Sequence, residues 1–270
     1  MKLYVLVDNN TIIDSYFKGE PALSFYIEVD GCKILFDTGY SDLFLENAQK
    51  MGINLKDLDY IVLSHGHNDH TCGLECLMNF DFNKKVKMVA HPLTFNKKID
   101  IDGPEIGCPL SINDLSKNFE LILTDKPYNL SSTIKFLGEI PRELDKRIVA
   151  VDKIVINNEI VPDFYLDDSA LVVTNNNKTT IITGCSHSGL INIVDYALKN
   201  TETMQINNII GGFHLLDNDS AKAEEIAKYL LTKDVTKIAP CHCTNLLAKC
   251  VFSKYFDVQE IGVGVCIKLD

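Results

Sequence analysis

Short apolar segments alternate with polar turns and amphipathic stretches along most of the chain. Apolar runs at residues 22–29 and 32–36 flank the dipeptide Asp30-Gly31. An Asp-Gly pair between two such runs predicts a β-hairpin, because both turn positions favour positive φ. Residues 60–63 are apolar throughout, which is typical of a short buried strand.

Apolar strands lead four times into a short turn that carries histidine, and a helix signal follows each turn. The four turns are residues 64–70, 184–189, 211–214 and 240–243. Loops that follow the strands of layered α/β proteins commonly form the active site. The alternation of strands and helices therefore predicts an α/β fold whose site is built from these loops.

The pattern becomes irregular between about residues 100 and 168, where several dipeptides ending in proline interrupt it. Apolar residues persist through this stretch, which favours an insertion into a folded core over an unstructured linker. We predict one domain over residues 1–270, with an insertion at about 100–168 that sets substrate specificity. Aromatic residues of the insertion either stack on a flat ring or belong to the core.

Composition and charge restrict the kind of partner. The chain has 46% hydrophobic residues, a formal net charge of −11 and a pI of about 5.1. An acidic chain does not attract nucleic acid through its overall field. No run approaches the roughly 18 consecutive apolar residues of a membrane helix. We therefore expect a small-molecule substrate and no nucleic-acid or membrane partner.

Cysteine usage indicates the compartment. Nine cysteines, an odd number, are scattered along the chain. A secreted protein stabilised by disulfides would be shorter and would have an even number of cysteines. The N-terminus also lacks the pattern of a signal peptide. We therefore expect reduced thiols and a cytoplasmic protein.

The most specific chemical signal is a histidine cluster directly after the predicted strand at residues 60–63. His65, His67 and His70 lie within six residues, and Asp69 lies among them. Imidazole and carboxylate together suit Zn²⁺, Fe²⁺ or Mn²⁺. Side chains at positions i and i+2 of an extended loop point the same way. His65 and His67 can therefore share one ion, while Asp69 and His70 can face a second one.

This cluster resembles the His-x-His-x-Asp-His signature of the metallo-β-lactamase superfamily, and residues 37–39 (Asp-Thr-Gly) resemble its Asp-x-Gly hallmark. The resemblance implies a four-layer αβ/βα sandwich with the metal at one edge between two mixed sheets. It also implies two divalent ions, with zinc as the first expectation and manganese or iron as alternatives. Asp37 is then expected to support the metal loop from outside the ligand shell.

Three later segments are similar to one subfamily of this superfamily: residues 183–189, 211–215 and 240–244. The subfamily contains proteins described as metal-dependent hydrolases. It also includes the archaeal enzyme 7,8-dihydropterin-6-yl-methyl-4-(β-D-ribofuranosyl)aminobenzene 5′-phosphate synthase. The resemblance therefore indicates the subfamily more strongly than it indicates a substrate.

Later histidines complete the predicted ligand set. Superfamily members usually have Gly-Asp at a strand end where this chain has Gly184-Cys185. The Cys185 thiolate is a possible ligand, but we favour His187, because imidazole is the commonest protein metal ligand and no histidine lies between positions 91 and 187. His242 stands where the family's last ligand lies and is predicted to bind metal. His214, after two glycines, is predicted to be a catalytic group that contacts substrate or transfers a proton, with a role as a further metal ligand left open as the alternative.

Two further sets of side chains carry donor atoms that could bind a metal. Carboxylates lie in the stretch where the family's third histidine usually occurs, at Asp163, Asp167 and Asp168. They remain open as substitutes for that histidine. Cys241 and Cys243 flank His242 and would point away from it on an extended backbone. We do not expect a zinc site made by these two thiols and His242.

The predicted ligands favour a metal-dependent hydrolase of a phosphoester, ester or related small-molecule bond. A water bound by two ions loses its proton near neutral pH and can attack carbon or phosphorus, with Asp69 orienting it. The substrate is expected to be phosphorylated or pterin-like. The resemblance also implies an alkyl transferase that joins a dihydropterin methyl diphosphate to an aminobenzene ribotide. An iron-dependent redox enzyme and a metal-binding module without turnover stay open as well.

Overall fold

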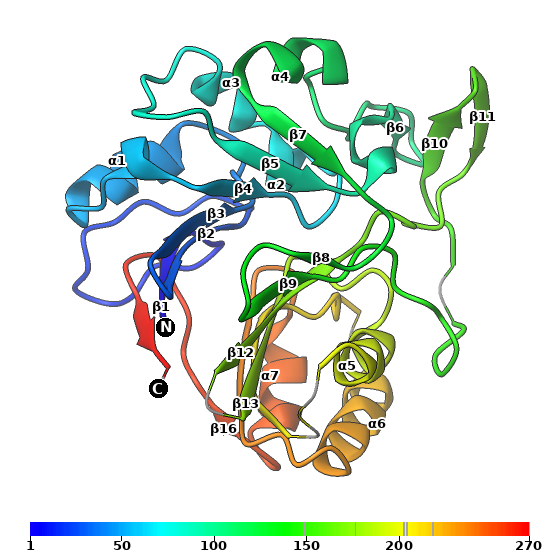
Figure 1. The fold of residues 1–270 in the computed structure, drawn as a ribbon. Helices are drawn as coiled ribbons and strands as arrows, with labels where there is room; N and C mark the ends of the chain where they lie inside the picture. The colour runs from blue at the N-terminus through cyan, green and yellow to red at the C-terminus, as the bar shows by residue number, and fades with distance from the viewer. Residues whose placement is uncertain (148, 176, 202, 204, 218, 270) are drawn as a thin grey trace. The chain divides into compact units, whose positions relative to one another are not determined.

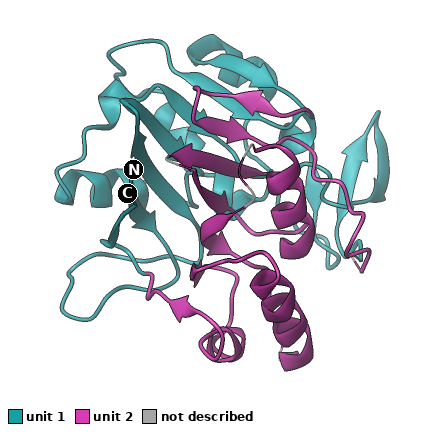
Figure 2. Ribbon diagram, turned by 60° about the horizontal axis from the view of Figure 1, so that its bottom comes forward, with its two compact units in different colours: residues 1–125, 149–167, 262–270 teal, residues 126–148, 168–261 magenta. Residues whose placement is uncertain are grey.

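The computed structural model describes the chain except for residues 148, 176, 202, 204, 218 and 270. The chain divides into two compact units (Figure 2). Unit 1 comprises residues 1–125, 149–167 and 262–270, and unit 2 comprises residues 126–148 and 168–261. Among the described residues, no helix has the length and apolar character needed to cross a membrane.

The main sheet of unit 1 has the strand order β17-β1-β2-β3-β4-β5-β7 (Figure 1). Its strands are β1 (Lys2–Val7), β2 (Ser24–Val29), β3 (Cys32–Phe36), β4 (Tyr60–Val62), β5 (Lys87–Ala90), β7 (Glu120–Leu123) and β17 (Cys266–Lys268). Strands β3, β4, β5 and β7 are parallel, and the others are antiparallel to their neighbours. The predicted hairpin is confirmed: β2 pairs with β3, and Asp30 and Gly31 have φ values of 51° and 76°.

Helices pack against this sheet through a common apolar core. They are α1 (Leu43–Lys50), α2 (Asn68–Thr71), α3 (Leu74–Leu77) and α4 (Ile112–Asn118), with 3₁₀ turns at Leu55–Asp57 and Pro92–Phe95. Leu35, Ile61 and Met88 of the strands are buried with Phe44 of α1 and Leu115 of α4. Burying such side chains contributes about 1.5–3 kcal/mol each, so this core fixes the position of β4 and of the loop after it.

A smaller sheet completes unit 1 and has the order β11-β10-β6. Its strands are β6 (Lys98–Ile99), β10 (Lys153–Ile156) and β11 (Glu159–Pro162). The antiparallel pairing of Lys98 with Ile154 joins two segments that are distant in sequence. Residues of this sheet and of the segment after it reach the histidine loop of the same unit.

The sheet of unit 2 has the order β16-β15-β14-β13-β12-β9-β8. Its strands are β8 (Tyr128–Asn129), β9 (Ile134–Phe136), β12 (Ala170–Asn175), β13 (Lys178–Thr183), β14 (Ile206–Gly212), β15 (Lys237–Cys241) and β16 (Asp257–Val258). Strands β13 to β16 run parallel, whereas β8, β9, β12 and β13 pair antiparallel. The loops that follow β13, β14 and β15 therefore emerge at the same edge of this sheet.

The helices of unit 2 are α5 (Leu190–Lys199), α6 (Ser220–Leu231) and α7 (Leu246–Phe252). They cover the sheet through a core that includes Ile193, Ile226 and Phe252. The side chain of Asp219 accepts hydrogen bonds from the N–H groups of Ala221 and Lys222 in the first turn of α6. Asp219 is therefore the N-cap of this helix, and Ser220 is its first residue.

Two helix starts differ from what the sequence suggests locally. Asn245, not Thr244, caps α7, because the Asn245 side chain accepts the N–H of Ala248 while the Thr244 hydroxyl accepts the N–H of Phe213. Asp42, not Ser41, stands at the N-cap of α1, although its side chain makes no capping bond. In both places a tertiary contact or loop geometry overrides the local preference.

The stretch from about residue 100 to 168 supplies strands to both units. Strand β7 pairs with β5 in unit 1, and β9 pairs with β12 in unit 2. Residue 148 of this stretch lies outside the described residues. That the chain is one domain, and that this stretch sets specificity, stay predictions.

Candidate metal centre

The histidine loop of unit 1 follows strand β4 directly. The strand is buried, and His65, two residues after Leu63, is fully buried as well. Gly66 lies so close to the main chain at Thr94 that an added Cβ would be 2.2 Å from the Thr94 carbonyl oxygen. A side chain cannot be accommodated at that distance, so the loop needs glycine at this position.

Three predicted ligands of this loop come together. One nitrogen from each of His65 and His67 and one carboxylate oxygen of Asp69 all lie within 4.8 Å of one another. The ring centroid of His65 is 4.7 Å from that of His67 and 4.2 Å from that of His70. Ligand atoms of one zinc ion lie roughly 3–4 Å apart, because metal–ligand distances are about 2.0–2.2 Å. The donor types and their spacing therefore fit a divalent metal ion.

Helix α2 begins within the histidine loop, at Asn68, and this places Asp69 and His70. Thr71 does not cap a helix, although its position after the histidine loop would suit a cap, because α2 already starts at Asn68 and His67 stands at its N-cap. The Thr71 hydroxyl instead donates a hydrogen bond of 2.8 Å to the carbonyl oxygen of His67 one turn earlier. Asp69 and His70 are thus held by a helical turn rather than by an extended loop.

Asp37 joins the two ends of the histidine loop. Its carboxylate accepts hydrogen bonds from the Ser64 N–H and hydroxyl, each at 2.7 Å, and lies 2.7 Å from Nδ1 of His70. Asp37 is fully buried and has a φ of 58°, a strained value for a non-glycine residue. Because Nδ1 of His70 is engaged, Nε2 is the nitrogen left for a ligand, and it lies 3.5 Å from Asp69. A residue that supports a metal loop from outside the ligand shell must make contacts of this kind, and that is the role predicted for Asp37.

His67 and His70 differ in their charge state. Burial and the ammonium group of Lys98 lower the pKa of His67 to about 4. Burial would also lower the pKa of His70, but the carboxylates of Asp69 and Asp37 hold it well above its ordinary value. His67 is therefore neutral and able to bind metal at neutral pH, whereas a metal must displace a proton from His70.

A buried ion cluster contacts the same loop. Nζ of Lys98 lies 2.6 Å from Asp163 and 3.0 Å from Asp167, and all three side chains are buried. The other carboxylate oxygen of Asp167 accepts the N–H of Gly66 at 2.8 Å. The sequence left these two carboxylates open as substitutes for a histidine ligand. Their hydrogen bonds show instead that both bind the Lys98 ammonium group, and that Asp167 also binds the backbone of the histidine loop.

The remaining predicted site residues lie at one edge of the unit 2 sheet. Cys185 and His187 follow β13, His214 follows β14 and His242 follows β15, and these strands are parallel neighbours. Ser186, His214 and His242 have φ values of 63°, 48° and 49°. Non-glycine residues at such values are strained and concentrate at functional sites. Three strained turns at adjacent strand ends mark this edge as a candidate site.

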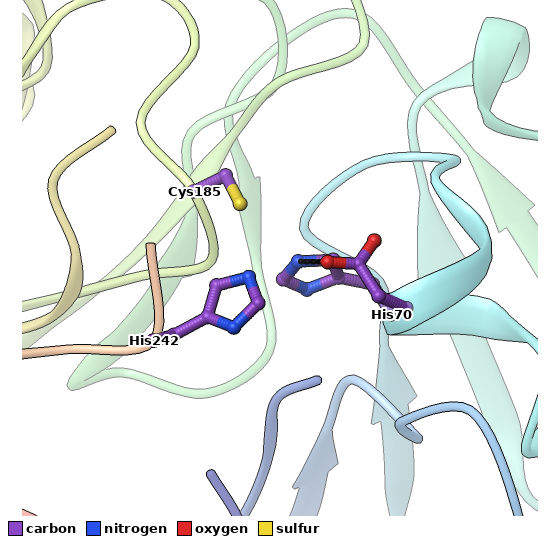
Figure 3. A group of neighbouring side chains, drawn as sticks. His70, Cys185 and His242 are labelled. Carbon is purple, nitrogen blue, oxygen red and sulfur yellow. Dashed lines mark ion pairs between the residues drawn. The ribbon is translucent and has the colours of Figure 1, made fainter. Parts of the chain in front are cut away.

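Side chains at this edge approach one another closely. The Cys185 thiol and a ring nitrogen of His242 lie within 4.8 Å of each other, on the two loops that Figure 3 shows at its left. The ring centroids of His187 and His214 are 4.3 Å apart. Both Cys185 and His187 are buried beside these rings, and both stay candidate ligands.

Asp168 supports the loop that carries these two residues. Its carboxylate accepts a hydrogen bond of 2.9 Å from the N–H of Ser188 and another from the Ser188 hydroxyl. Both residues are buried. Asp168, the third carboxylate that the sequence offered as a ligand, therefore positions the turn between Gly184 and Gly189.

Cys243 is a member of this edge that the sequence pattern did not indicate. We expected it to point away on an extended backbone, but the φ of 49° at His242 breaks the alternation. Its sulfur accepts the N–H of His214 at 3.3 Å, and its thiol donates to the carbonyl of Cys185 at 3.4 Å. Burial would raise the pKa of Cys243, but hydrogen bonding with Cys185 and the charge of His242 hold it well below its usual value. The sequence feature that could have indicated this position of Cys243 is Gly212, because a glycine there leaves room for the Cys243 sulfur.

Known proteins resemble this chain over nearly its full length. The sequence model of the Metallo-beta-lactamase superfamily matches residues 18–106. The chain is 33% identical to the 7,8-dihydropterin-6-methyl-4-(beta-D-ribofuranosyl)-aminobenzene-5'-phosphate synthase of Methanocaldococcus jannaschii, over 99% of this chain and 96% of that protein. It is 34% identical to an uncharacterized protein of the same organism, over 90% and 91% of the two chains.

A solved structure is also similar. Tm1679, described as a metal-dependent hydrolase of the beta-lactamase superfamily, has a TM-score of 0.86 and 27% identity to this chain, with 100% of this chain and 99% of that one covered. The predicted α/β fold class is confirmed by this likeness and by the family match.

Proposed function

This chain belongs to the metallo-β-lactamase superfamily, and we propose that it is a metal-dependent hydrolase of a phosphoester, ester or related bond in a small molecule. The observation that carries the proposal is the approach of His65, His67 and Asp69 at the end of β4. A strained, buried aspartate and a glycine that tolerates no side chain hold this loop in place. Such support is typical of sites whose ligands must be preorganised.

We assign the metal ligands within each unit separately. In unit 1, the ligands are His65, His67, Asp69 and His70. In unit 2, they are His187 and His242, with Cys185 as the alternative to His187. Two divalent ions, zinc in the first instance, would suit this many nitrogen and oxygen donors. A bound ion would supply a water whose pKa is lowered to near 7 and a positive charge that polarises the scissile bond.

The chain's own residues would position the reactants. The side chain of Asp69 is 20% exposed, whereas His70 beside it is fully buried, so Asp69 is the member of the loop that can also reach a substrate or water. Asp37 binds Nδ1 of His70 and so leaves Nε2 of this ring as the nitrogen available to a metal ion. His214, on the strained turn after β14, is assigned to contact substrate or to transfer a proton to the leaving group.

A second candidate function is alkyl transfer between a dihydropterin methyl diphosphate and an aminobenzene ribotide. The observation that favours it is the 33% identity, over 99% of this chain, to a relative named as a synthase of this kind. A metal site that neutralises a diphosphate leaving group would serve either reaction. The two functions differ in the nucleophile, which is water in the hydrolase and the aminobenzene ribotide in the transferase.

Turnover by the zinc-loaded protein tests both functions. Under the first, a chromogenic phosphodiester is hydrolysed, and under the second, only the pterin diphosphate with its ribotide acceptor gives product. Asp69→Ala should abolish turnover and reduce bound metal while the far-ultraviolet circular dichroism stays unchanged. Asp81→Ala, at an exposed aspartate whose ion pair is with Lys56, is the matched control. Full activity in Asp69→Ala would rule out the assigned site.

A further inference from the structure

A second group of metal-binding donors lies wholly within unit 2. The Sγ atoms of Cys185 and Cys243 and one ring nitrogen of His214 all lie within 4.8 Å of one another. Zn–S distances are about 2.3 Å and Zn–N distances about 2.0–2.1 Å, so donors around one tetrahedral ion are roughly 3.4–3.8 Å apart. A small inward movement of the side chains would bring these three donors to bonding distance of a single ion.

The backbone around this group is shaped to hold the Cys243 sulfur. A Cβ added at Gly212 would lie 2.6 Å from the Cys243 sulfur and 2.4 Å from the Gly184 carbonyl oxygen. The N–H of His214 donates to the same sulfur at 3.3 Å, and such bonds stabilise a thiolate. The left-handed turn at His242 directs the Cys243 side chain to this position. A thiol that is merely buried in a core needs neither the glycine, nor the N–H donor, nor the left-handed turn.

His214 supplies an independent indication. Its Nδ1 atom is buried, and the structure gives it no hydrogen-bond partner among the described residues. Buried polar atoms in native proteins are nearly always satisfied, so an exception calls for a ligand, an ion or a catalytic role. An ion held by the two neighbouring sulfurs would satisfy this nitrogen.

The chemistry of the group selects the kind of ion. Two thiolates and one imidazole favour thiophilic ions such as Zn²⁺ over Mn²⁺ or Mg²⁺, whereas the loop of unit 1 offers nitrogen and oxygen donors. Two thiolates also neutralise a divalent cation, which lowers the cost of holding charge at buried positions.

We propose that Cys185, His214 and Cys243 form a binding site for a thiophilic divalent ion in unit 2, in addition to the histidine loop of unit 1. Water or a neighbouring imidazole completes the tetrahedral shell. The proposal assigns Cys185 to this site and leaves His187 and His242 as the histidine ligands of unit 2. When this ion is bound, His214 is a ligand, so the proton-transfer role assigned to it under the proposed function applies only to protein without this second ion.

Cobalt binding to the full-length chain tests the proposal. In a His65→Ala, His67→Ala background, one equivalent of Co²⁺ should still bind and produce the intense near-ultraviolet absorption of a thiolate ligand. Cys243→Ser in that background should abolish this absorption. Cys241→Ser is the matched control, because Cys241 is a buried thiol at the end of β15, two residues before Cys243, that lies outside the group, and it should leave the absorption unchanged.

A second measurement covers the case in which the double variant does not fold. Zinc-edge X-ray absorption of the wild-type, zinc-loaded chain should show sulfur neighbours at about 2.3 Å, and Cys243→Ser should reduce their number. An absence of sulfur neighbours, or cobalt absorption that survives Cys243→Ser, would overturn the proposal. Neither readout depends on turnover, so the outcome is separate from that of the hydrolase assay.

Discussion

Lys98 illustrates how single residues of this protein act through burial. Its ammonium group is completely buried between the carboxylates of Asp163 and Asp167, and Asp167 in turn binds the N–H of Gly66. Burial alone would lower the pKa of Lys98, but the two aspartates raise it above its ordinary value. The positive charge is therefore kept, and it links the β6 segment to the histidine loop.

Replacing Lys98 by methionine should lower the free energy of unfolding by about 3–5 kcal/mol, because two buried carboxylates lose their counter-ion. Urea unfolding of the metal-free protein measures this change. Lys56→Met is the control, since Lys56 pairs with Asp81 at the surface and should change stability by no more than about 0.5 kcal/mol. Equal stabilities of the two variants would show that the buried cluster contributes nothing beyond a surface pair.

At the scale of single elements, strands were easier to locate than the first residues of helices. The hairpin of β2 and β3 follows from a local dipeptide and two apolar runs. By contrast, α2 begins at Asn68, inside the histidine loop, and α7 is capped by Asn245 because the Thr244 hydroxyl accepts the N–H of Phe213. Caps depend on which nearby side chain is not already bonded elsewhere, and that is a property of the tertiary structure.

The N-cap of α6 gives a prediction at this scale. Asp219→Ala should destabilise the protein by about 1 kcal/mol, because two N–H groups of the first turn lose their acceptor. The neighbouring Ser220→Ala should change stability by only about a few tenths of a kcal/mol, since Ser220 is already inside the helix. Thermal unfolding of both variants distinguishes them, and a larger loss in Ser220→Ala would show that the cap is misassigned.

At the scale of the whole molecule, metal binding should be linked to stability and to pH. Removing metal with a chelator should lower the melting temperature, and added Zn²⁺ should restore it, because the ion binds only the folded chain. Denaturation scans with and without chelator test this. A melting temperature that does not respond to zinc would contradict the assigned ligands.

The pH dependence of zinc affinity follows from the ligand protons. The carboxylates around His70 hold its pKa above the ordinary value, so at neutral pH the ring carries a proton that the ion must displace. Affinity should therefore fall as the solution is acidified and keep rising above neutral pH until the raised pKa of His70 is passed. Competition with a calibrated chelator at several pH values measures this slope, and an affinity independent of pH would exclude His70 as a ligand.

Local patterns in the sequence determined the α/β class, the family and the histidine loop. A run of six residues carries the metal signature, and the strand–turn–helix periodicity repeats along the chain, so neither needs knowledge of distant contacts. Only the tertiary structure decided that Asp163 and Asp167 bind Lys98, and that Cys243 joins Cys185 and His214. The physical reason is that these partners meet through the pairing of distant strands and through left-handed turns that reverse side-chain direction, neither of which residue spacing reveals.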